Sequence, residues 1–359
     1  MRRGLIAWSR AELPEAVLDA RIARLQAAMS RDGLDALIVY TIPARTAGVS
    51  WATGFVPYWN EGLAVIPRLG RPVLVSALSN RVKGWIERNA HVERVVSNPK
   101  IGAEAASIVA ANVGKAVVGL VDLPRLPAHL VEALTAAGHQ LRDASALFAA
   151  VRAVADPAEL ALASQAASIA RSAFECGSAG IDDGERDAGR LIGLMEGEAR
   201  RRGAEEVYPA VAVDLDRRRN LVRLEGAATL GARSAIRLSV AYKGVWVRMT
   251  RTLIPADKEL VALAEAEVRF ARAVATLPNP SALVATTSSW VIEGTRASTP
   301  LEPLAGSRIT DPAELQAGEI VSIQATFDLA GHPILIGAPI LLGTVGIPAS
   351  QLIPPPSHT

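Results

Sequence analysis

The stretch that decides the fold is SAIRLSVAYKGVWVRMTRTL, residues 234–253. Apolar residues recur at every second position on both sides of Lys243 and Gly244, which is typical of a β-hairpin with one face in a core. The opposite face carries Arg237 on the first arm and Arg248 on the second, and Arg251 follows just beyond. The sequence therefore predicts a central hairpin over residues 235–253 that presents two arginines on one face.

This hairpin resembles that of the pita-bread proteins, which include prolidase, aminopeptidase P, creatinase and methionine aminopeptidase. In that family it has the form I-D-L-G, an aromatic, G-Y and then D-x-T-R-T, and its two aspartates hold a pair of divalent metals. This chain keeps the frame but has Arg237 and Arg248 at the aspartate positions. Carboxylate ligands neutralise bound cations, whereas guanidinium groups repel them, so we expect no metal there.

Two other segments resemble the family. Residues 51–55, WATGF, are similar to the Y-L-T-G-F turn of its amino-terminal domain, and residues 315–324, LQAGEIVSIQ, to L-x-x-G-x-V-x-x-I-E. The resemblance puts Gln324 at the glutamate of I-E, Ala338 at the glutamate that precedes an aspartate on the last strand, and the histidine of the G-H-G turn near Gly294 and Thr295. Glutamine is a weak neutral metal ligand and alanine cannot bind a metal at all, so we expect too few ligands for metallopeptidase chemistry.

Creatinase, which keeps the fold without metal, uses a histidine as its proton shuttle. Counted back from Arg237 at the family's spacing, that histidine falls on Asn220. An amide cannot act as a general base. Neither catalytic strategy of the family carries over to this chain.

Length and element order predict an α+β protein of two domains. The 359 residues, half of them apolar, are enough for two cores. We expect an amino-terminal α/β domain like that of creatinase and prolidase over residues 1–150. A pita-bread domain, a curved antiparallel sheet covered by helices, should follow over residues 151–347, with a tail over 348–359.

Hydrophobic periodicity sets the expected elements. Helices are predicted at residues 15–30, 81–90, 156–174, 185–202 and 258–275. Strands are predicted at residues 37–40, 62–66, 73–76, 116–122, 208–213 and 333–342, in addition to the hairpin. Residues 277–300, rich in Pro, Ser and Thr, are expected to be a loop with one short helix.

Composition excludes several classes of protein. The net charge of +2 gives no argument for nucleic acid as a partner. A single cysteine, Cys176, excludes an internal disulfide and favours a cytoplasmic location. We find no apolar run long enough for a signal peptide or a membrane span, and the five histidines are scattered rather than paired at metal-ligand spacing.

The arginines at the metal positions need negative charge nearby, because burying them alone costs several kcal/mol. One alternative is a bound carboxylate or phosphate. The other is internal salt bridging to a carboxylate around the same site: Asp214, Asp216, Glu225, Glu293 or Glu302. The candidate ligand-binding residues are Arg237, Arg248, Asn220, Gln324, Trp246 and Tyr242, although aromatic residues on strands more often belong to a core.

Two functions remain open. One is a metal-independent hydrolase or lyase acting on a C–N bond of a small anionic, amino-acid-like metabolite, with Asp214 or Asp216 as the only nearby acid or base and with no cofactor. The other is a catalytically inactive relative that serves as a binding or dimerisation module. The resemblance also implies a homodimer, in which the apolar residues 51–55 with Tyr58 and Trp59 would close the partner's cavity.

Overall fold

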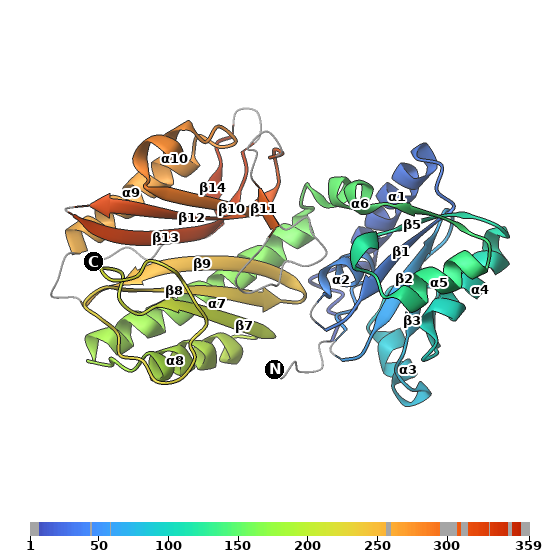
Figure 1. Cartoon of the computed structure of the whole chain (residues 1–359), viewed down its shortest axis with the longest axis horizontal. Coiled ribbons are helices and arrows are strands. Elements are labelled where there is room, and N and C mark those ends of the chain that lie inside the picture. The colour runs from blue at the N-terminus through green and yellow to red at the C-terminus, as the bar shows by residue number, and fades with distance from the viewer. Residues whose placement is uncertain are drawn as a thin grey trace. The chain divides into compact units, whose positions relative to one another are not determined.

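The computed structural model describes residues 7–43, 45–57, 59–255, 260–294, 307–309, 315–329, 331–343 and 347–352. The described chain forms two compact units, one ending at Ala158 and the other beginning at Glu159 (Figure 1). The boundary predicted at residue 150 falls inside helix α6 (Ser145–Arg152), whose Phe148 is buried in the core of the first unit. The first domain therefore keeps this helix.

The first domain is a six-stranded sheet with helices on both faces. Its elements are α1 (Glu15–Arg31), β1 (Ala36–Thr41), α2 (Ala47–Thr53), β2 (Gly62–Pro67), β3 (Val73–Ser76), α3 (Asn80–Arg88), β4 (Arg94–Ser97), α4 (Ile101–Val113), β5 (Val117–Leu120), a 3-10 turn (Leu123–Arg125), α5 (Ala128–Ala136), β6 (Gln140–Asp143) and α6. The strand order is β4-β3-β2-β1-β5-β6. Parallel pairing of β1 with β5 and of β5 with β6 confirms the predicted α/β layer.

Successive side chains of a strand point to opposite faces of the sheet and therefore pack into two separate cores. Leu37 and Val39 of β1 lie in a core with residues of α1, α2, α3 and α6. Ile38, between them, lies in a second core with residues of α4 and α5. The helix predicted from position 15 is α1, whose Leu25 and Met29 are fully buried.

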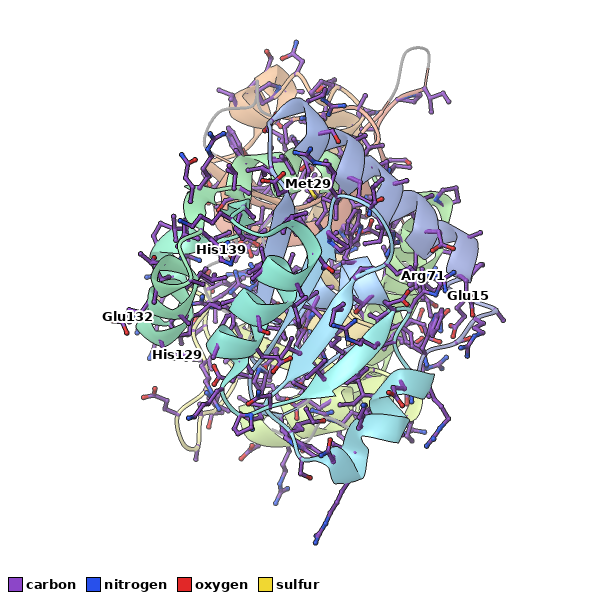
Figure 2. All side chains as sticks on the ribbon, turned by 90° about the vertical axis from the view of Figure 1, so that its right-hand side faces the viewer. Glu15, Met29, Arg71, His129, Glu132 and His139 are labelled. Atoms are coloured by element: carbon purple, nitrogen blue, oxygen red, sulfur yellow. The ribbon has the colours of Figure 1, made fainter. Side chains whose placement is uncertain are left out.

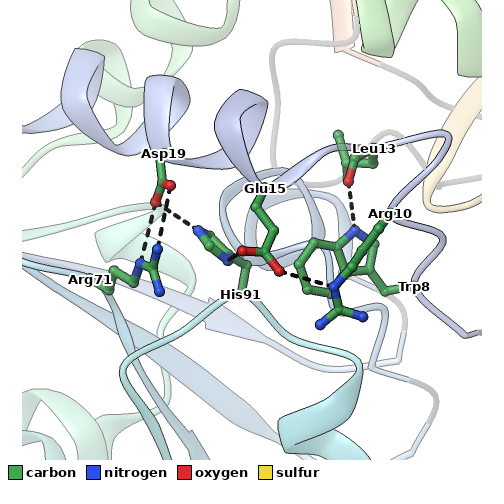
Figure 3. A network of polar contacts seen from close by, with 7 residues as sticks. All are labelled: Trp8, Arg10, Leu13, Glu15, Asp19, Arg71 and His91. Atoms are coloured by element: carbon green, nitrogen blue, oxygen red, sulfur yellow. Dashed lines mark hydrogen bonds and ion pairs between the residues drawn. The ribbon is translucent and has the colours of Figure 1, made fainter.

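A polar network joins the segment from Trp8 to Asp19 to the rest of the first domain (Figure 3). His91, which is buried, places Nε2 2.7 Å from Asp19 Oδ1 and packs its ring edge-on against Trp8. The hydrogen bond from His91 holds the pKa of the Asp19 carboxyl below its ordinary value, and the Arg71 guanidinium, 3.4 Å away, lowers this pKa further. Figure 2 shows Arg71 and Glu15 together on one side of the domain.

The segment predicted as an exposed turn is instead part of the first core. Trp51 lies in the last turn of helix α2, Gly54 adopts a left-handed conformation that ends the helix, and Phe55 follows. Trp51 and Phe55 are each only 4% exposed and belong to one hydrophobic cluster of this domain. They cannot supply the dimer surface expected from the sequence. Trp59 is exposed, and Tyr58 lies outside the described residues.

The second domain is an antiparallel sheet covered by helices (Figure 1). Its elements are α7 (Pro157–Asp182), α8 (Ala188–Arg201), β7 (Glu206–Ala212), β8 (Ser234–Tyr242), β9 (Val245–Leu253), α9 (Leu260–Val274), α10 (Ser281–Thr286), β10 (Ser289–Gly294), β11 (Ser307–Ile309), β12 (Ile320–Leu329), β13 (His332–Leu341) and β14 (Ser350–Gln351). The strand order is β11-β10-β12-β13-β9-β8-β7, with β14 on β13. The predicted hairpin β8–β9 is therefore internal to the sheet.

Helix α7 runs eight residues past its predicted end at residue 174. In the sequence, Gly177 and Gly180 suggested the end of the helix, but in the structure they contact α8. A Cβ on Gly177 would lie 2.8 Å from Met195 Sδ, and one on Gly180 would lie 2.9 Å from Leu191 Cδ1. Close helix packing, rather than a turn, explains these glycines.

Two further expectations are corrected. The predicted loop at 277–300 contains the short helix α10 but also strand β10, which pairs with β12 throughout. The predicted tail contributes β14, because Ser350 and Gln351 pair with Leu341 and Ile340. Strand pairing between distant segments overrides local composition in both cases. Within the described parts of the chain, every helix is too short or too polar to span a bilayer.

Candidate functional site

Strand register gathers polar side chains on one face of the second sheet. Arg237 lies opposite Thr250, Thr250 opposite Gly337, and Gly337 opposite Gln324. Residues directly opposite one another share a face, as do residues two positions apart on a strand. We call the resulting set the polar band: Arg237, Ser239, Arg248, Thr250, Glu293, Ser322 and Gln324.

Arg248 has its counter-charge within the chain. Its guanidinium NH1 donates to Glu293 Oε2 at 2.5 Å, and its Nε donates to Ser239 Oγ at 3.0 Å. The two charged side chains are only 8% and 12% exposed. Arg248 therefore forms the internal salt bridge that was one of the two alternatives for this residue. Of the other expected carboxylates, Glu225 is exposed and Glu302 lies outside the described residues.

Thr250 and Gln324 meet across the strand that lies between them. The hydroxyl of Thr250 donates to Gln324 Oε1 at 3.1 Å, above Gly337. A Cβ on Gly337 would lie 3.1 Å from Thr250 Oγ1 and 2.8 Å from the carbonyl oxygen of Ile323. Only glycine leaves room for this contact.

The assignment of Ala338 to the site is wrong by one residue. Ala338 pairs with Ile323, is fully buried, and belongs to the hydrophobic cluster formed with α9. Gly337 is the residue of β13 that faces Gln324 and Thr250. Because the side-chain period is two, a slip of one position moves a residue to the opposite face of the sheet.

Apolar clusters bound the polar band at both ends. At one end Ala212, Ala235 and Leu335 are covered by Leu215 and Leu221 from the β7–β8 connection. At the other end Ala241 and Trp246 form a cluster with Tyr208. Polar groups framed by apolar surface are typical of small-molecule sites.

The register separates the predicted site residues. Trp246 lies on the same face as Arg248, whereas Tyr242 lies on the opposite face, where a Cβ on Gly203 would lie 3.4 Å from its ring. Asn220 is exposed in the β7–β8 connection, two residues before the bridge of Val222 to the edge strand β7. Tyr242 and Asn220 therefore do not join the polar band.

The candidate acids lie at the rim of this face. Asp216 forms a salt bridge at 2.7 Å with Arg233, whose hydrogen bonds hold the pKa of the Asp216 carboxyl below its ordinary value. His332 Nδ1 lies 3.6 Å from the same carboxylate. Asp214 accepts the backbone N–H of Asp216 at 3.0 Å. Both carboxylates thus organise the β7–β8 connection.

The fold has many solved counterparts. Residues 21–154 match the family model of the Creatinase/Prolidase N-terminal domain. The prolidase from Pyrococcus furiosus is 16% identical with a TM-score of 0.69, and the match covers 92% of this chain and 98% of that one. The X-Pro aminopeptidase from Thermotoga maritima is 18% identical with a TM-score of 0.70, covering 92% and 96%. The chain has the pita-bread fold.

The N-terminal domain of the FACT complex subunit SPT16 from Eremothecium gossypii has the same architecture, with 14% identity, a TM-score of 0.62 and coverage of 94% and 96%. No curated protein sequence matches the chain. The expected creatinase-like first domain and pita-bread second domain are confirmed. At such identities the likeness establishes the fold, and the activity must be argued from the polar band.

The polar band does not fit the metal pair that the family resemblance implies. The four positions aligned across the sheet are Arg237, Thr250, Gly337 and Gln324, and Arg248 occupies the second aspartate position. Divalent metals in such sites need anionic oxygen or imidazole ligands. Among the described residues, no three His, Cys, Asp or Glu side chains are placed to hold a metal ion. The expected histidine position at Thr295 lies outside those residues.

Three polar-band residues were missed from the sequence. Ser239 and Ser322 contact Arg248, and Thr250 contacts Gln324. The period-two pattern held the signal, because Ser239 follows Arg237 by two positions and Ser322 precedes Gln324 by two. For Gly337 no local signal existed, since only the pairing of β13 with both neighbours shows which face it occupies.

Proposed function

We propose that the polar band of the pita-bread domain binds a small anionic, amino-acid-like metabolite without a metal pair. The observation that carries this proposal is the placement of two guanidinium side chains, Arg237 and Arg248, on adjacent strands and on one face of the sheet. Arginine forks are well suited to carboxylates and phosphates. Glu293 on the neighbouring strand β10 pairs with one of them, Arg248.

The remaining polar-band residues suit recognition. Thr250 and Gln324 offer a hydroxyl and an amide in the same row as Arg237, and Ser239 and Ser322 offer hydroxyls beside Arg248. These side chains donate and accept hydrogen bonds, so they orient an anion without neutralising the arginines. Arg237 is half-buried, which places its charge in surroundings less polar than bulk water.

Binding is better supported than turnover. Among its described residues the polar band pairs no nucleophile with a neighbouring base. The low pKa of Asp216 keeps that carboxylate ionised at neutral pH, which argues against a role as general acid. Hydrolysis or elimination at a C–N bond is therefore the part of the proposal that needs an activity screen.

A second candidate is a catalytically inactive homologue of this fold that serves as a binding or homodimerisation module. It is favoured by the salt bridge from Arg248 to Glu293, which supplies counter-charge without a ligand. Glu206, fully buried on the same face one row beyond the polar band, adds a further carboxylate. Light scattering that gives a dimer, with no response to any carboxylate, would support this candidate.

Thermal shift measurements with citrate and phosphate, together with metal analysis of the purified protein, test the first proposal. We expect citrate to raise the melting temperature of the wild type and of Arg219→Gln, a control arginine that pairs with Asp328 outside the polar band. Arg237→Gln should abolish the shift, because it removes a guanidinium from the polar band. Stoichiometric transition metal, or a citrate shift that survives Arg237→Gln, would contradict the proposal.

A further inference from the structure

Two neighbouring strands of the first domain send the chain to opposite faces of their sheet. Strands β1 and β5 pair in parallel, so their carboxyl ends lie at the same edge. The chain leaves β1 for α2, which packs in one core of the domain, and leaves β5 for α5, which packs in the other (Figure 1). In open α/β sheets, ligands bind beyond the carboxyl ends of strands where the connections diverge in this way. This edge of the first domain therefore has the topology of a ligand site.

Asp122, which follows β5 at this edge, has a carboxylate that the fold does not use. The residue is half-buried, and its backbone is left-handed, with φ of 58° and ψ of 39°. Its N–H donates to Ser145 Oγ at 2.8 Å, and its carbonyl oxygen accepts the N–H of Arg125 at 2.8 Å. Among the described residues, the side chain of Asp122 forms neither a hydrogen bond nor an ion pair. A half-buried carboxylate in a fixed backbone is therefore left to bond elsewhere.

Two arginines lie near Asp122 without pairing with it. Arg45 reaches across from the β1–α2 connection, and its NH1 donates to the carbonyl oxygen of Arg125 at 3.3 Å, in the 3-10 turn that begins after Asp122. Arg125 itself is exposed, and neither arginine has a carboxylate partner in the part of the chain that the structure describes. Burial raises the pKa of the Asp122 carboxyl, and the two guanidiniums oppose this only in part. The charges of opposite sign are thus close together but not joined.

Two other carboxylates at this edge are already bonded. Asp143, after β6, accepts from both the N–H and the hydroxyl of Ser145. Glu61, before β2, accepts from the Tyr40 hydroxyl at 2.8 Å and lies 3.8 Å from His129 Nε2. Neither acid therefore needs the arginines near Asp122 as partners.

The charges around Asp122 favour a ligand that carries both signs. The charged groups that act on Asp122 are Arg125, Arg45, Asp143 and the buried Arg152. A simple carboxylate would be attracted by the guanidiniums but would put a second anion beside Asp122. A simple ammonium would be repelled by the same guanidiniums. A zwitterion avoids both costs, because its carboxylate can meet the guanidinium forks and its ammonium can meet Asp122.

We propose that the edge formed by the carboxyl ends of β1 and β5 binds a zwitterionic α-amino acid, with its ammonium group at Asp122 and its carboxylate at Arg45 and Arg125. The amino acid supplies the donor that the described chain does not give to Asp122, and it adds no net charge. The site belongs to the first domain, so it is separate from the polar band and does not depend on the proposed function.

Calorimetric titration with L-alanine, propionate and ethylamine tests this inference, because the two analogues lack the ammonium and the carboxylate in turn. The titrations use the full chain, as wild type and as Arg237→Gln, which removes a guanidinium from the polar band. We expect alanine to bind both proteins roughly tenfold more tightly than propionate, as a hydrogen bond to a charged group implies. Ethylamine should not bind.

Substitutions at the edge separate the two halves of the ligand. Asp122→Asn removes the charge but keeps a residue type that tolerates the left-handed backbone, so it should abolish the preference for alanine over propionate. Arg125→Gln should weaken alanine and propionate alike, because both present a carboxylate. Asp32→Asn is the matched control: this exposed aspartate follows α1 and precedes β1, toward the amino end of that strand, and its loss should change neither affinity.

The outcomes distinguish this inference from the proposed function. Alanine that binds no better than propionate, or a preference that survives Asp122→Asn, would overturn the site at Asp122. Alanine binding that Arg237→Gln abolishes would also overturn it, and would assign the amino acid to the polar band. If Asp122→Asn does not fold, Arg125→Gln decides, since alanine binding that is indifferent to this substitution contradicts the inference.

Discussion

Strand β9 buries two arginines three residues apart, on opposite faces of one sheet. Arg248 lies in the polar band and bonds to Glu293 and Ser239. Arg251 lies on the face covered by helices, where its NH1 donates to the carbonyl oxygens of Thr250 and Gly337, and Glu267 is 4.0 Å away. Burial lowers the pKa of Arg251 to about 10, so the group is still charged at neutral pH.

The difference shows how one residue type serves two purposes. Arg251 links backbone carbonyls of neighbouring strands, and two of its guanidinium nitrogens, Nε and NH2, have no hydrogen-bond partner among the described residues. Arg248 forms a close charge pair with Glu293 and also donates to Ser239. The first arginine supports the sheet, and the second supports the site that we propose.

The largest effect on stability should follow from removing the salt bridge between Arg248 and Glu293 in the polar band. Arg248→Met removes the guanidinium that pairs with the buried carboxylate of Glu293, and we expect a loss of about 3–5 kcal/mol in the free energy of unfolding. Adding Glu293→Gln to Arg248→Met should restore much of the lost stability, because the buried negative charge is then removed as well. Urea unfolding of both single variants and the double variant measures the coupling. A coupling near zero would mean that the pair does not exist in solution.

A smaller effect is expected from the same replacement on the helix-covered face. Arg251→Met loses the bonds to Thr250 and Gly337 but also removes a charge from apolar surroundings, and these two contributions oppose each other. The loss should be at most about 2 kcal/mol. Urea unfolding under the same conditions allows a direct comparison. If Arg251→Met proves more damaging than Arg248→Met, the contrast between the two faces is wrong.

The smallest expected effect is a change in stability at low pH that depends on Asp216. Arg233 lowers the pKa of Asp216 in the folded state. The ionised carboxylate therefore stabilises the fold at pH values above its ordinary pKa near 3.8. That contribution disappears as the pH falls through the lowered folded pKa. Asp216→Asn should therefore melt below wild type at pH 6, and the gap should close under acid conditions. Asp183→Asn, at an exposed carboxylate after α7, is the control. A gap that is independent of pH would exclude the Asp216–Arg233 contribution.

Much of the architecture followed from periodicity. The alternation around Lys243 and Gly244 predicted the hairpin, and it placed Arg237, Arg248 and Trp246 on one face, as observed. The same rule applied consistently would have excluded Tyr242, which lies five positions from Arg237 and so falls on the other face. Local pattern is reliable within one strand or hairpin because the side-chain period there is fixed.

The sequence by itself determined that Arg237 and Arg248 lie on one face of a hairpin, and the resemblance predicted that they stand where the family has metal-binding aspartates. Only the tertiary structure decided that Glu293, forty-five positions away, neutralises Arg248, and that Gly337 rather than Ala338 lies between Thr250 and Gln324. Side-chain type is a local property of the chain. Which distant groups share a face depends on the register of strands that are far apart in sequence, and that register is set by packing of the whole core.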